Sequence, residues 1–315
     1  MPPILVHIGY HKTGTNWLQE EFFGDPATGY RWLDKRPITH PVNRLIRARP
    51  LDFDATTIRK EFDPLIEDAE AAGLLPVVSF GRLSGHPYSG GYDSKEIADR
   101  LKQVFPEARI LVVIREQQSM ILSTYKQYVK AGGASTVEHF LVPGRKHGWR
   151  VPGFDFGHFE YDRPIRYYQS LYGRDAVLAL PYDQFVADGR GFVDEIARFA
   201  GRPVPGNVLD RMPFSRRSNE ASSALAIAAS RPLNRFGPRS DLNPATLLPA
   251  KTLFRLAKRL QSSSLEAPGA RAMVARSEAR MWRAVEDAVG ERYLASNRLT
   301  VELTGLDLAA YGWMV

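Results

Sequence analysis

The segment HIGYHKTGTNW, residues 7–17, is the most informative part of this chain. A short apolar run at Ile4–Ile8 leads into it, and a helical pattern follows at Thr15–Phe23. Between them, Gly9 and Gly14 bracket four residues. We therefore expect a buried strand, a glycine turn and a helix in succession. Backbone N–H groups of such a turn converge on an anion, and the positive end of the helix adds to the attraction, so the segment predicts a phosphate-binding loop.

The side chains of this loop suit the same ligand. The hydroxyls of Thr13 and Thr15 and the amide of Asn16 can donate hydrogen bonds to phosphate oxygens. Lys12 lies within the turn, where its charge would stabilise a leaving oxygen. A nucleoside-triphosphatase loop instead has Lys and a Mg²⁺-binding Ser/Thr directly after its second glycine, whereas Thr15 and Asn16 follow Gly14 here. The loop predicts one bound phosphate group and no metal, and the alternative is a plain turn with a solvated lysine.

Strand and helix patterns alternate over the first 205 residues. Further strands are expected at Leu75–Phe80, Ile110–Ile114 and Ala176–Leu180, and helices at Ser94–Phe105 with Ser94 as N-cap, Ser119–Lys130 and Gly191–Ala200. This alternation predicts an α/β fold with a mainly parallel sheet, whose ligands bind at the carboxyl ends of the strands. Residues 206–315 read mostly as helices, so we expect a helical extension that packs on the core, residues 1–205, within one domain, residues 1–315.

Composition excludes several classes of protein. The chain has 315 residues and no cysteine, which excludes disulfides, thiolate catalysis and cysteine-bound metals. A formal net charge of +7 suits anionic ligands, but there is no block of Lys/Arg and no zinc-finger spacing, so nucleic acid is not an expected partner. There is no apolar run of the ~20 residues that span a bilayer and no signal-peptide pattern. We expect a cytoplasmic protein without a metal, and the oligomeric state stays open.

Two motifs resemble one known family. Residues His7–Gln19 closely resemble the 5′-phosphosulfate-binding loop of sulfotransferases, especially bacterial ones with a Tyr-His-Lys-Thr-Gly-Thr core. In ILVVIREQQSMILSTY, residues 110–125, the strand pattern ends at Arg115 and Ser123 follows eight residues later. The resemblance implies that Arg115 and Ser123 hold the 3′-phosphate of 3′-phosphoadenosine 5′-phosphosulfate (PAPS), which a guanidinium and a hydroxyl can do.

The resemblance extends over most of the chain, through residues 82–116 and 177–201. It implies the sulfotransferase variant of the P-loop α/β fold, with PAPS as donor and 3′-phosphoadenosine 5′-phosphate (PAP) as product. The segment FSRRSN, residues 214–219, stands at the place of a second grip on the 3′-phosphate. Trp17 matches an aromatic residue that stacks on adenine, and the alternative for Trp17 is a place in the core. The implied nucleotide-binding residues are Lys12, Thr13, Gly14, Thr15, Asn16, Trp17, Arg115, Ser123, Arg216, Arg217, Ser218 and Asn219.

The chain departs from the family at the general base. Bacterial relatives have a glutamate in a Ser-Asn-Glu-x-Leu-Ser-Gly-like stretch, whereas residues 79–85 read SFGRLSG, which leaves Gly81 at the glutamate position. His11, beside Lys12, or His86 is the candidate replacement, and Asp93 is a weaker one. Otherwise the chain binds PAPS without transferring sulfate, or its acceptor is as acidic as a phenol and needs little help from a base.

The resemblance implies an enzyme that moves a sulfuryl group from PAPS to an acceptor hydroxyl. The acceptor is expected to be a carbohydrate, a glycolipid or a small metabolite. Aromatic residues in Gly85–Tyr92 and Val129–Tyr161 line the acceptor site or pack in the core. The alternatives are a catalytically impaired PAP-binding protein, favoured by Gly81, and a small-molecule P-loop kinase, disfavoured by the lysine position.

Overall fold

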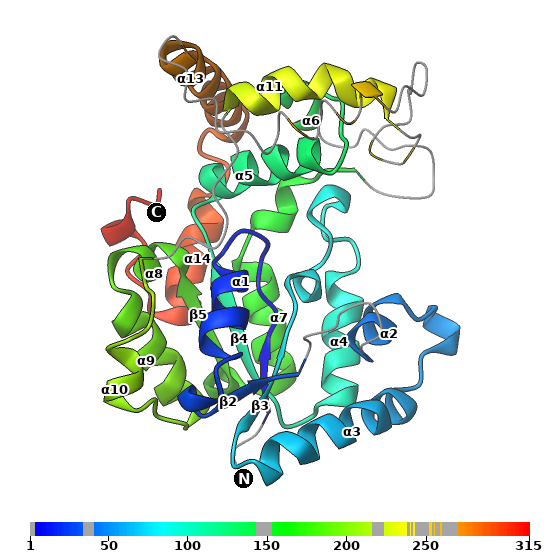
Figure 1. The fold of residues 1–315 in the computed structure, drawn as a ribbon, viewed down its shortest axis with the longest axis vertical. Helices are drawn as coiled ribbons and strands as arrows, with labels where there is room; N and C mark the ends of the chain where they lie inside the picture. The colour runs from blue at the N-terminus through cyan, green and yellow to red at the C-terminus, as the bar shows by residue number, and fades with distance from the viewer. Residues whose placement is uncertain are drawn as a thin grey trace.

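The structure is a computed structural model that describes residues 4–33, 41–142, 153–215, 224–237 and 270–315, with a few single positions between 240 and 259. Its centre is a five-stranded sheet in the order β2-β3-β1-β4-β5, with every neighbouring pair parallel. The strands are β1 (Leu5–His7), β2 (Tyr30–Trp32), β3 (Leu75–Ser79), β4 (Arg109–Ile114) and β5 (Val177–Pro181) (Figure 1). The prediction of an α/β fold with a parallel sheet is confirmed.

β1 occupies the middle of the sheet. Its Val6 lies opposite Val78 of β3 on one side and Ile110 of β4 on the other. The chain passes from β1 through β2 to β3 and then crosses β1 to reach β4. The loops that follow β1 and β4 therefore leave neighbouring strand ends in opposite directions, and such a point is where parallel sheets bind ligands.

Side-chain alternation in the strands builds two apolar layers, one on each face of the sheet. In β4, Ile110, Val112 and Ile114 face the first layer, where α3 (Ala55–Ala71), α4 (Ser94–Val104) and α7 (Asp162–Tyr172) pack. Leu111 and Val113 face the second layer, with Trp17 of α1 (Thr15–Trp17) and five buried residues of α9 (Gly189–Ala200). Helices on both faces bury β1, β3 and nearly all of β4, as the uninterrupted apolar run of β4 predicts.

The remaining helices lie at the ends and edges of this core. They are α2 (Pro41–Arg47), α5 (Gln117–Lys130), α6 (Val137–Phe140), α8 (Tyr182–Ala187), α10 (Gly206–Leu209), α11 (Ala224–Leu233), α13 (Ala270–Val289) and α14 (Leu294–Thr304). α5, α6, α11 and α13 pack on one another above the carboxyl ends of the strands, and α14 packs on α7 (Figure 1). The helical C-terminal region is thus confirmed, while a single domain divided at residue 205 stays a prediction.

Three local features differ from the expected ones. The helix expected at Thr15–Phe23 is α-helical only over Thr15–Trp17 and continues as a π-helix over Leu18–Phe22. The N-cap of α4 is Asp93 rather than Ser94, and its carboxylate pairs with Arg82 instead of capping the helix. β2, α3 and α7 were not expected, since β2 has three residues and α3 carries Pro64 and few apolar residues.

Arg100 on α4 gives a test of the core. Its side chain is 4% exposed, donates to the carbonyls of Leu45 and Ala48 at 2.8 and 2.7 Å, and pairs with Glu96. We expect Arg100→Met to lower the free energy of unfolding by about 2–4 kcal/mol, because the buried Leu45 carbonyl, the Ala48 carbonyl and the Glu96 carboxylate lose their donor. Urea unfolding measures it. The matched control on the same helix, Lys95→Met, removes an exposed cation and should change stability far less; equal effects would contradict the role of Arg100.

Candidate active site

The loop between β1 and α1 has a strained backbone. Lys12 has φ 68°, and among the described residues it alone combines a positive φ with a side chain larger than that of glycine. Gly14, at φ 76°, is the residue from which α1 starts. The Thr13 hydroxyl donates to the Tyr10 carbonyl at 2.6 Å, which holds the turn in place. A left-handed lysine costs on the order of 1–2 kcal/mol, and such strain is concentrated at functional sites.

The two threonine hydroxyls are therefore placed differently from the expectation. Thr13 is 1% exposed, and Thr15 Oγ1 donates to the same Tyr10 carbonyl at 3.4 Å. In this structure both hydroxyl protons stabilise the turn rather than face a ligand. Asn16 is exposed, and the first N–H groups of a helix have no partner inside the helix. Lys12, Asn16 and the backbone remain as donors toward an anion at the loop.

Arg115 lies against this loop. It follows β4 directly, and its Nη1 donates to the Lys12 carbonyl at 3.2 Å. Its guanidinium carbon lies 5.4 Å from the centre of the Tyr182 ring, and its own carbonyl accepts from the Tyr161 hydroxyl at 2.7 Å. The structure thus brings together the two motifs that the sequence separates by about a hundred residues, with four guanidinium N–H groups left for other acceptors.

Positive charge is concentrated beside the loop. Burial lowers the pKa of Lys12, and the charges of Lys130 and Arg115 lower it further. Lys130 and Ser123 both belong to α5 and are seven residues apart, so they lie on one face of that helix. Cations that repel one another at a loop of N–H donors favour binding of an anion. Of the expected anion-binding residues, Lys12 and Arg115 are in contact, and Ser123 is half-buried on the same helix as Lys130.

Trp17 is placed in the core. It is 2% exposed, its Nε1 donates to the Pro213 carbonyl at 3.1 Å, and its ring packs on Phe185 and Phe214 with centroids 4.7 and 5.5 Å away. Stacking of Trp17 on adenine would require one of these rings to move. The expected second grip, Arg216, Arg217, Ser218 and Asn219, lies outside the described residues, although Phe214 brings the chain next to it close to α1.

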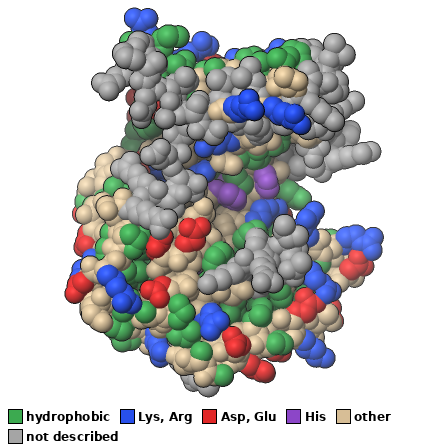
Figure 2. All heavy atoms as spheres, in the orientation of Figure 1, with side chains coloured by type: hydrophobic (Ala, Val, Ile, Leu, Met, Phe, Trp, Pro, Cys, Tyr) green, Lys and Arg blue, Asp and Glu red, His purple; other side chains and the backbone are tan. Residues whose placement is uncertain are grey.

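The candidate bases gather on the other side of the loop. The charge of Arg82 contributes to lowering the pKa of His11, of His86 and of His158, so all three lie within its electrostatic reach. Arg82 itself pairs with Asp93. Figure 2 shows histidine side chains beside Lys and Arg in the hollow between the upper helices and the α/β core. We call these five residues the histidine cluster. Arg82 was not expected to belong to the site, although it stands in the stretch SFGRLSG, and His158 lies in Val129–Tyr161, which was expected to line the acceptor site or pack in the core.

His11 lies next to the position where the family has glutamate. A Cβ atom on Gly81 would lie 3.9 Å from both Cδ2 and Nε2 of the His11 ring. The ring therefore lies within van der Waals contact of a side chain at position 81. His86 is held differently, because its Nδ1 accepts from the Tyr88 N–H at 3.2 Å. A neutral His86 then carries its proton on Nε2, which makes it a hydrogen-bond donor rather than a base.

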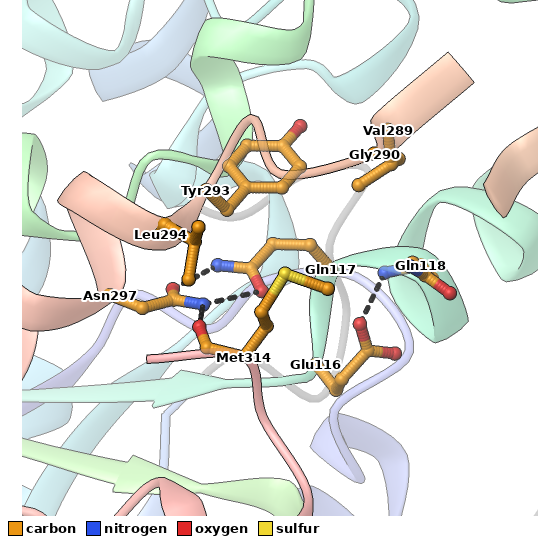
Figure 3. Close-up of a pocket in the computed structure, with 9 residues that line it drawn as sticks. All are labelled: Glu116, Gln117, Gln118, Val289, Gly290, Tyr293, Leu294, Asn297 and Met314. Atoms are coloured by element: carbon orange, nitrogen blue, oxygen red, sulfur yellow. Dashed lines mark hydrogen bonds between the residues drawn. The ribbon is translucent and has the colours of Figure 1, made fainter. Parts of the chain in front are cut away.

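The C-terminal residues anchor the start of α5 (Figure 3). The Glu116 carboxylate accepts from the N–H groups of Gln118 and Ser119, both at 2.8 Å. Gln117 donates to Asn297 Oδ1 at 2.5 Å, and Asn297 donates to the Met314 carbonyl at 2.7 Å. These side chains line a small pocket. Because they fix the helix that bears Ser123 and Lys130, the C-terminal region helps to position the anion site.

One family model matches the chain. Residues 96–206 match the model of the sulfotransferase family. This segment, which contains Arg115 and Ser123 but not the loop of β1, is similar to sulfotransferases, and the resemblance noted in the sequence is confirmed. No curated protein matches the chain.

Several solved structures are similar to the chain. A sulfotransferase from Alicyclobacillus acidocaldarius is 16% identical over 73% of this chain and 90% of its own, with a TM-score of 0.46. The sulfotransferase domain of the Synechococcus PCC 7002 olefin synthase is 15% identical over 89% of this chain and 93% of its own, with a TM-score of 0.41. Mouse sulfotransferase SULT7A1 complexed with PAP is 13% identical over 91% of this chain and 90% of its own, with a TM-score of 0.32. At such TM-scores the likeness does not define the site of this chain.

The described residues include neither a membrane-spanning helix nor a cluster of metal-binding side chains. No described helix is long and apolar enough to span a membrane. Among the same residues, no group of three or more His, Asp or Glu side chains could hold a metal ion.

Burial of the histidines gives a pH test. Burial lowers the pKa of His158 to about 3 and that of His11 to about 4. In the unfolded chain the pKa of a histidine is about 6.5, so a histidine takes up a proton there but not in the folded protein as the pH falls from 7 to 5. This difference favours unfolding by about 2 kcal/mol per buried histidine. We expect urea unfolding to show this loss of stability and His158→Gln to make it smaller by a similar amount. The exposed His139→Gln should keep the wild-type pH dependence; a His158→Gln variant that also keeps it would contradict the prediction.

Proposed function

We propose that the protein is a PAPS-dependent sulfotransferase that acts on a hydroxyl acceptor. The observation that carries the proposal is the hydrogen bond from Arg115 to the carbonyl of Lys12. It supports one nucleotide site built from the 7–17 loop and the end of β4, where two anionic groups of one ligand can be held at once. The similarity of residues 96–206 to the sulfotransferase family supports the same ligand class.

The residues fit a donor with separate 5′ and 3′ anionic groups. The loop N–H groups and Lys12 would hold the 5′-phosphosulfate. Arg115 and Ser123 would hold the 3′-phosphate, with Arg216, Arg217, Ser218 and Asn219 as a proposed second grip. Lys130 adds charge on the same side. PAPS supplies the sulfuryl group that is transferred, and the site is proposed to need no metal.

Lys12 is the residue that we place on the leaving oxygen. Its backbone is held by Thr13 and Arg115, and its ammonium is partly desolvated. A cation fixed in a region of low dielectric stabilises charge that develops on the 5′-phosphate oxygen as the bond to sulfur breaks. Sulfuryl transfer, like phosphoryl transfer, depends mainly on such charge stabilisation and on in-line positioning of the acceptor.

His11 is the proposed general base. It lies between Lys12 and Gly81, and burial keeps its imidazole neutral at pH 7, so it can accept the proton of an acceptor hydroxyl. An anion bound beside Lys12 favours the imidazolium form and raises the pKa of His11 as the proton arrives. His86, whose Nδ1 is already an acceptor, is proposed to donate to the acceptor or to the sulfuryl oxygens instead.

Two alternatives differ in what they bind. A catalytically impaired PAP-binding protein would keep the nucleotide site and lack transfer, and Gly81 favours it. A small-molecule kinase would need ATP and Mg²⁺, and the position of Lys12 disfavours it. We propose a carbohydrate, a glycolipid or a small metabolite as acceptor, and the cytoplasm as location.

Nucleotide preference tests the donor site. We expect PAP to bind at least tenfold more tightly than ADP without Mg²⁺, a difference of ~1.4 kcal/mol, because only PAP carries a 3′-phosphate. Titration calorimetry measures both dissociation constants. In Arg115→Ala the preference should fall to about twofold or less, because the guanidinium that distinguishes the ligands is gone.

Arg190→Ala is the matched control, because Arg190 is an exposed arginine paired with Asp210 on the far side of α9. It should keep the preference for PAP. Binding of ADP as tight as that of PAP in the wild-type protein, or binding of neither, would refute the sulfotransferase proposal at its first step.

Substitutions at positions 11 and 81 test whether His11 is the general base. We expect His11→Ala to lower kcat about 10²- to 10⁴-fold with little change in PAP affinity, because the proton acceptor is lost. Removing the ring also frees the space beside position 81. His11→Ala/Gly81→Glu should therefore recover at least tenfold of the lost kcat, measured as PAP release from PAPS with a panel of alcohols. Gly81→Glu alone should not exceed the wild-type kcat, since His11 already serves as the base; full activity of His11→Ala would exclude His11 as the base.

A further inference from the structure

Four buried polar atoms of the histidine cluster have no hydrogen-bond partner among the described residues. They are His11 Nδ1, Arg82 Nη1, Asp93 Oδ1 and His158 Nε2. Each unpaired buried group costs on the order of 1–3 kcal/mol, and native proteins keep few of them. Four such atoms in one cluster indicate a site that a ligand completes.

Contacts within the histidine cluster and with its neighbours fix the positions of its side chains. Arg82 Nη2 pairs with Asp93 Oδ2, which leaves the second nitrogen and the second oxygen of the same two groups. His158 is buried against the turn that precedes Asp93, where a Cβ atom on Gly91 would lie 2.1 Å from its Nδ1. Only glycine, which here has φ 61°, leaves room for the ring. His158 also packs on Tyr10, with ring centroids 5.1 Å apart, so its position is fixed from both sides.

The free atoms define the chemistry of the missing group. Arg82 can only donate and the Asp93 carboxylate can only accept. A second carboxylate or a sulfate accepts only and is repelled by Asp93, whereas an ammonium donates only and is repelled by Arg82. The two atoms together call for a neutral group that both accepts and donates, and a substrate hydroxyl is such a group. His11 Nδ1 calls for another hydroxyl, the one whose proton the base removes.

We infer that Arg82, Asp93 and His158 form an acceptor subsite that selects substrates with a second hydroxyl next to the one at His11. The substrate class is a neutral vicinal diol, as sugar rings carry, rather than a lone phenol or a monohydric alcohol. The inference rests on the proposed sulfotransferase function and adds a specificity determinant to it. Sites that hydrogen-bond a substrate hydroxyl reject analogues without it, because buried groups are then left unpaired.

A pair of matched alcohols tests the subsite. cis-1,2-Cyclohexanediol and cyclohexanol share one ring and differ by one hydroxyl. With PAPS as donor and PAP release as the measured rate, we expect kcat/KM at least tenfold higher for the diol in the wild-type protein. The ratio of the two rates does not depend on how much of a preparation is folded, so a merely structural role of the cluster would not change it.

Two variants complete the test. Arg82→Met/Asp93→Leu removes both charges together, so no lone buried charge destabilises the fold. In this variant the ratio of kcat/KM for the diol to that for cyclohexanol should fall to about one. Its affinity for PAP should stay within about twofold of the wild-type value. Lys95→Met, which removes a cation from the exposed side of α4, should keep the wild-type ratio.

The outcomes separate this inference from the proposed function. A protein that binds PAP but shows a ratio near one, or a double variant that keeps the high ratio, overturns the subsite and leaves the donor site intact. If PAP binds and neither alcohol reacts, ligand-observed NMR of both alcohols with the PAP-bound protein decides, and equal or absent binding also overturns it. Failure to bind PAP removes the sulfotransferase function itself.

Discussion

The contact between Arg115 and the carbonyl of Lys12 is the constraint on which the rest of the site depends. It exists because β1 stands between β3 and β4, so that the loops after β1 and β4 leave adjacent strand ends. A buried, fully hydrogen-bonded sheet fixes those ends far more firmly than a loop could. The left-handed backbone of Lys12 is tolerated only within such a frame, where Thr13 and Arg115 hold both sides of the turn.

The site has two halves with different electrostatics. On the side of α5, burial and the charges of Lys130 and Arg115 lower the pKa of Lys12, and that region suits a ligand with several negative charges. On the side of the histidine cluster, the one buried anion, Asp93, is paired with Arg82, and burial keeps the imidazoles neutral. In the proposed function, these two environments on either side of Lys12 bind a highly charged donor and an uncharged acceptor next to each other.

The sequence predicted the parts of this arrangement that depend on local pattern. Runs of branched apolar residues located β1, β3, β4 and β5, and the glycines located the turn, since both signals depend on neighbours in the chain. β2 was missed because three residues carry too little periodicity, and α3 because its interior contains Pro64. The family resemblance supplied Arg115 and Ser123, although only the fold brings Arg115 to the loop.

Contacts between distant segments could not be read in the same way. The stacking of Phe214 on Trp17 turns an apparent ligand residue into a core residue, and nothing within residues 7–17 signals it. The histidine cluster combines the loop of β1, the turn after β3, the start of α4 and the segment before α7. Gly81 appeared as the loss of a base, and only the fold shows His11 in the adjacent space. Under the proposed function, the absence of a carboxylate at position 81 is an exchange of one base for another, because the imidazole of His11 lies in contact with the place where a side chain at position 81 would begin.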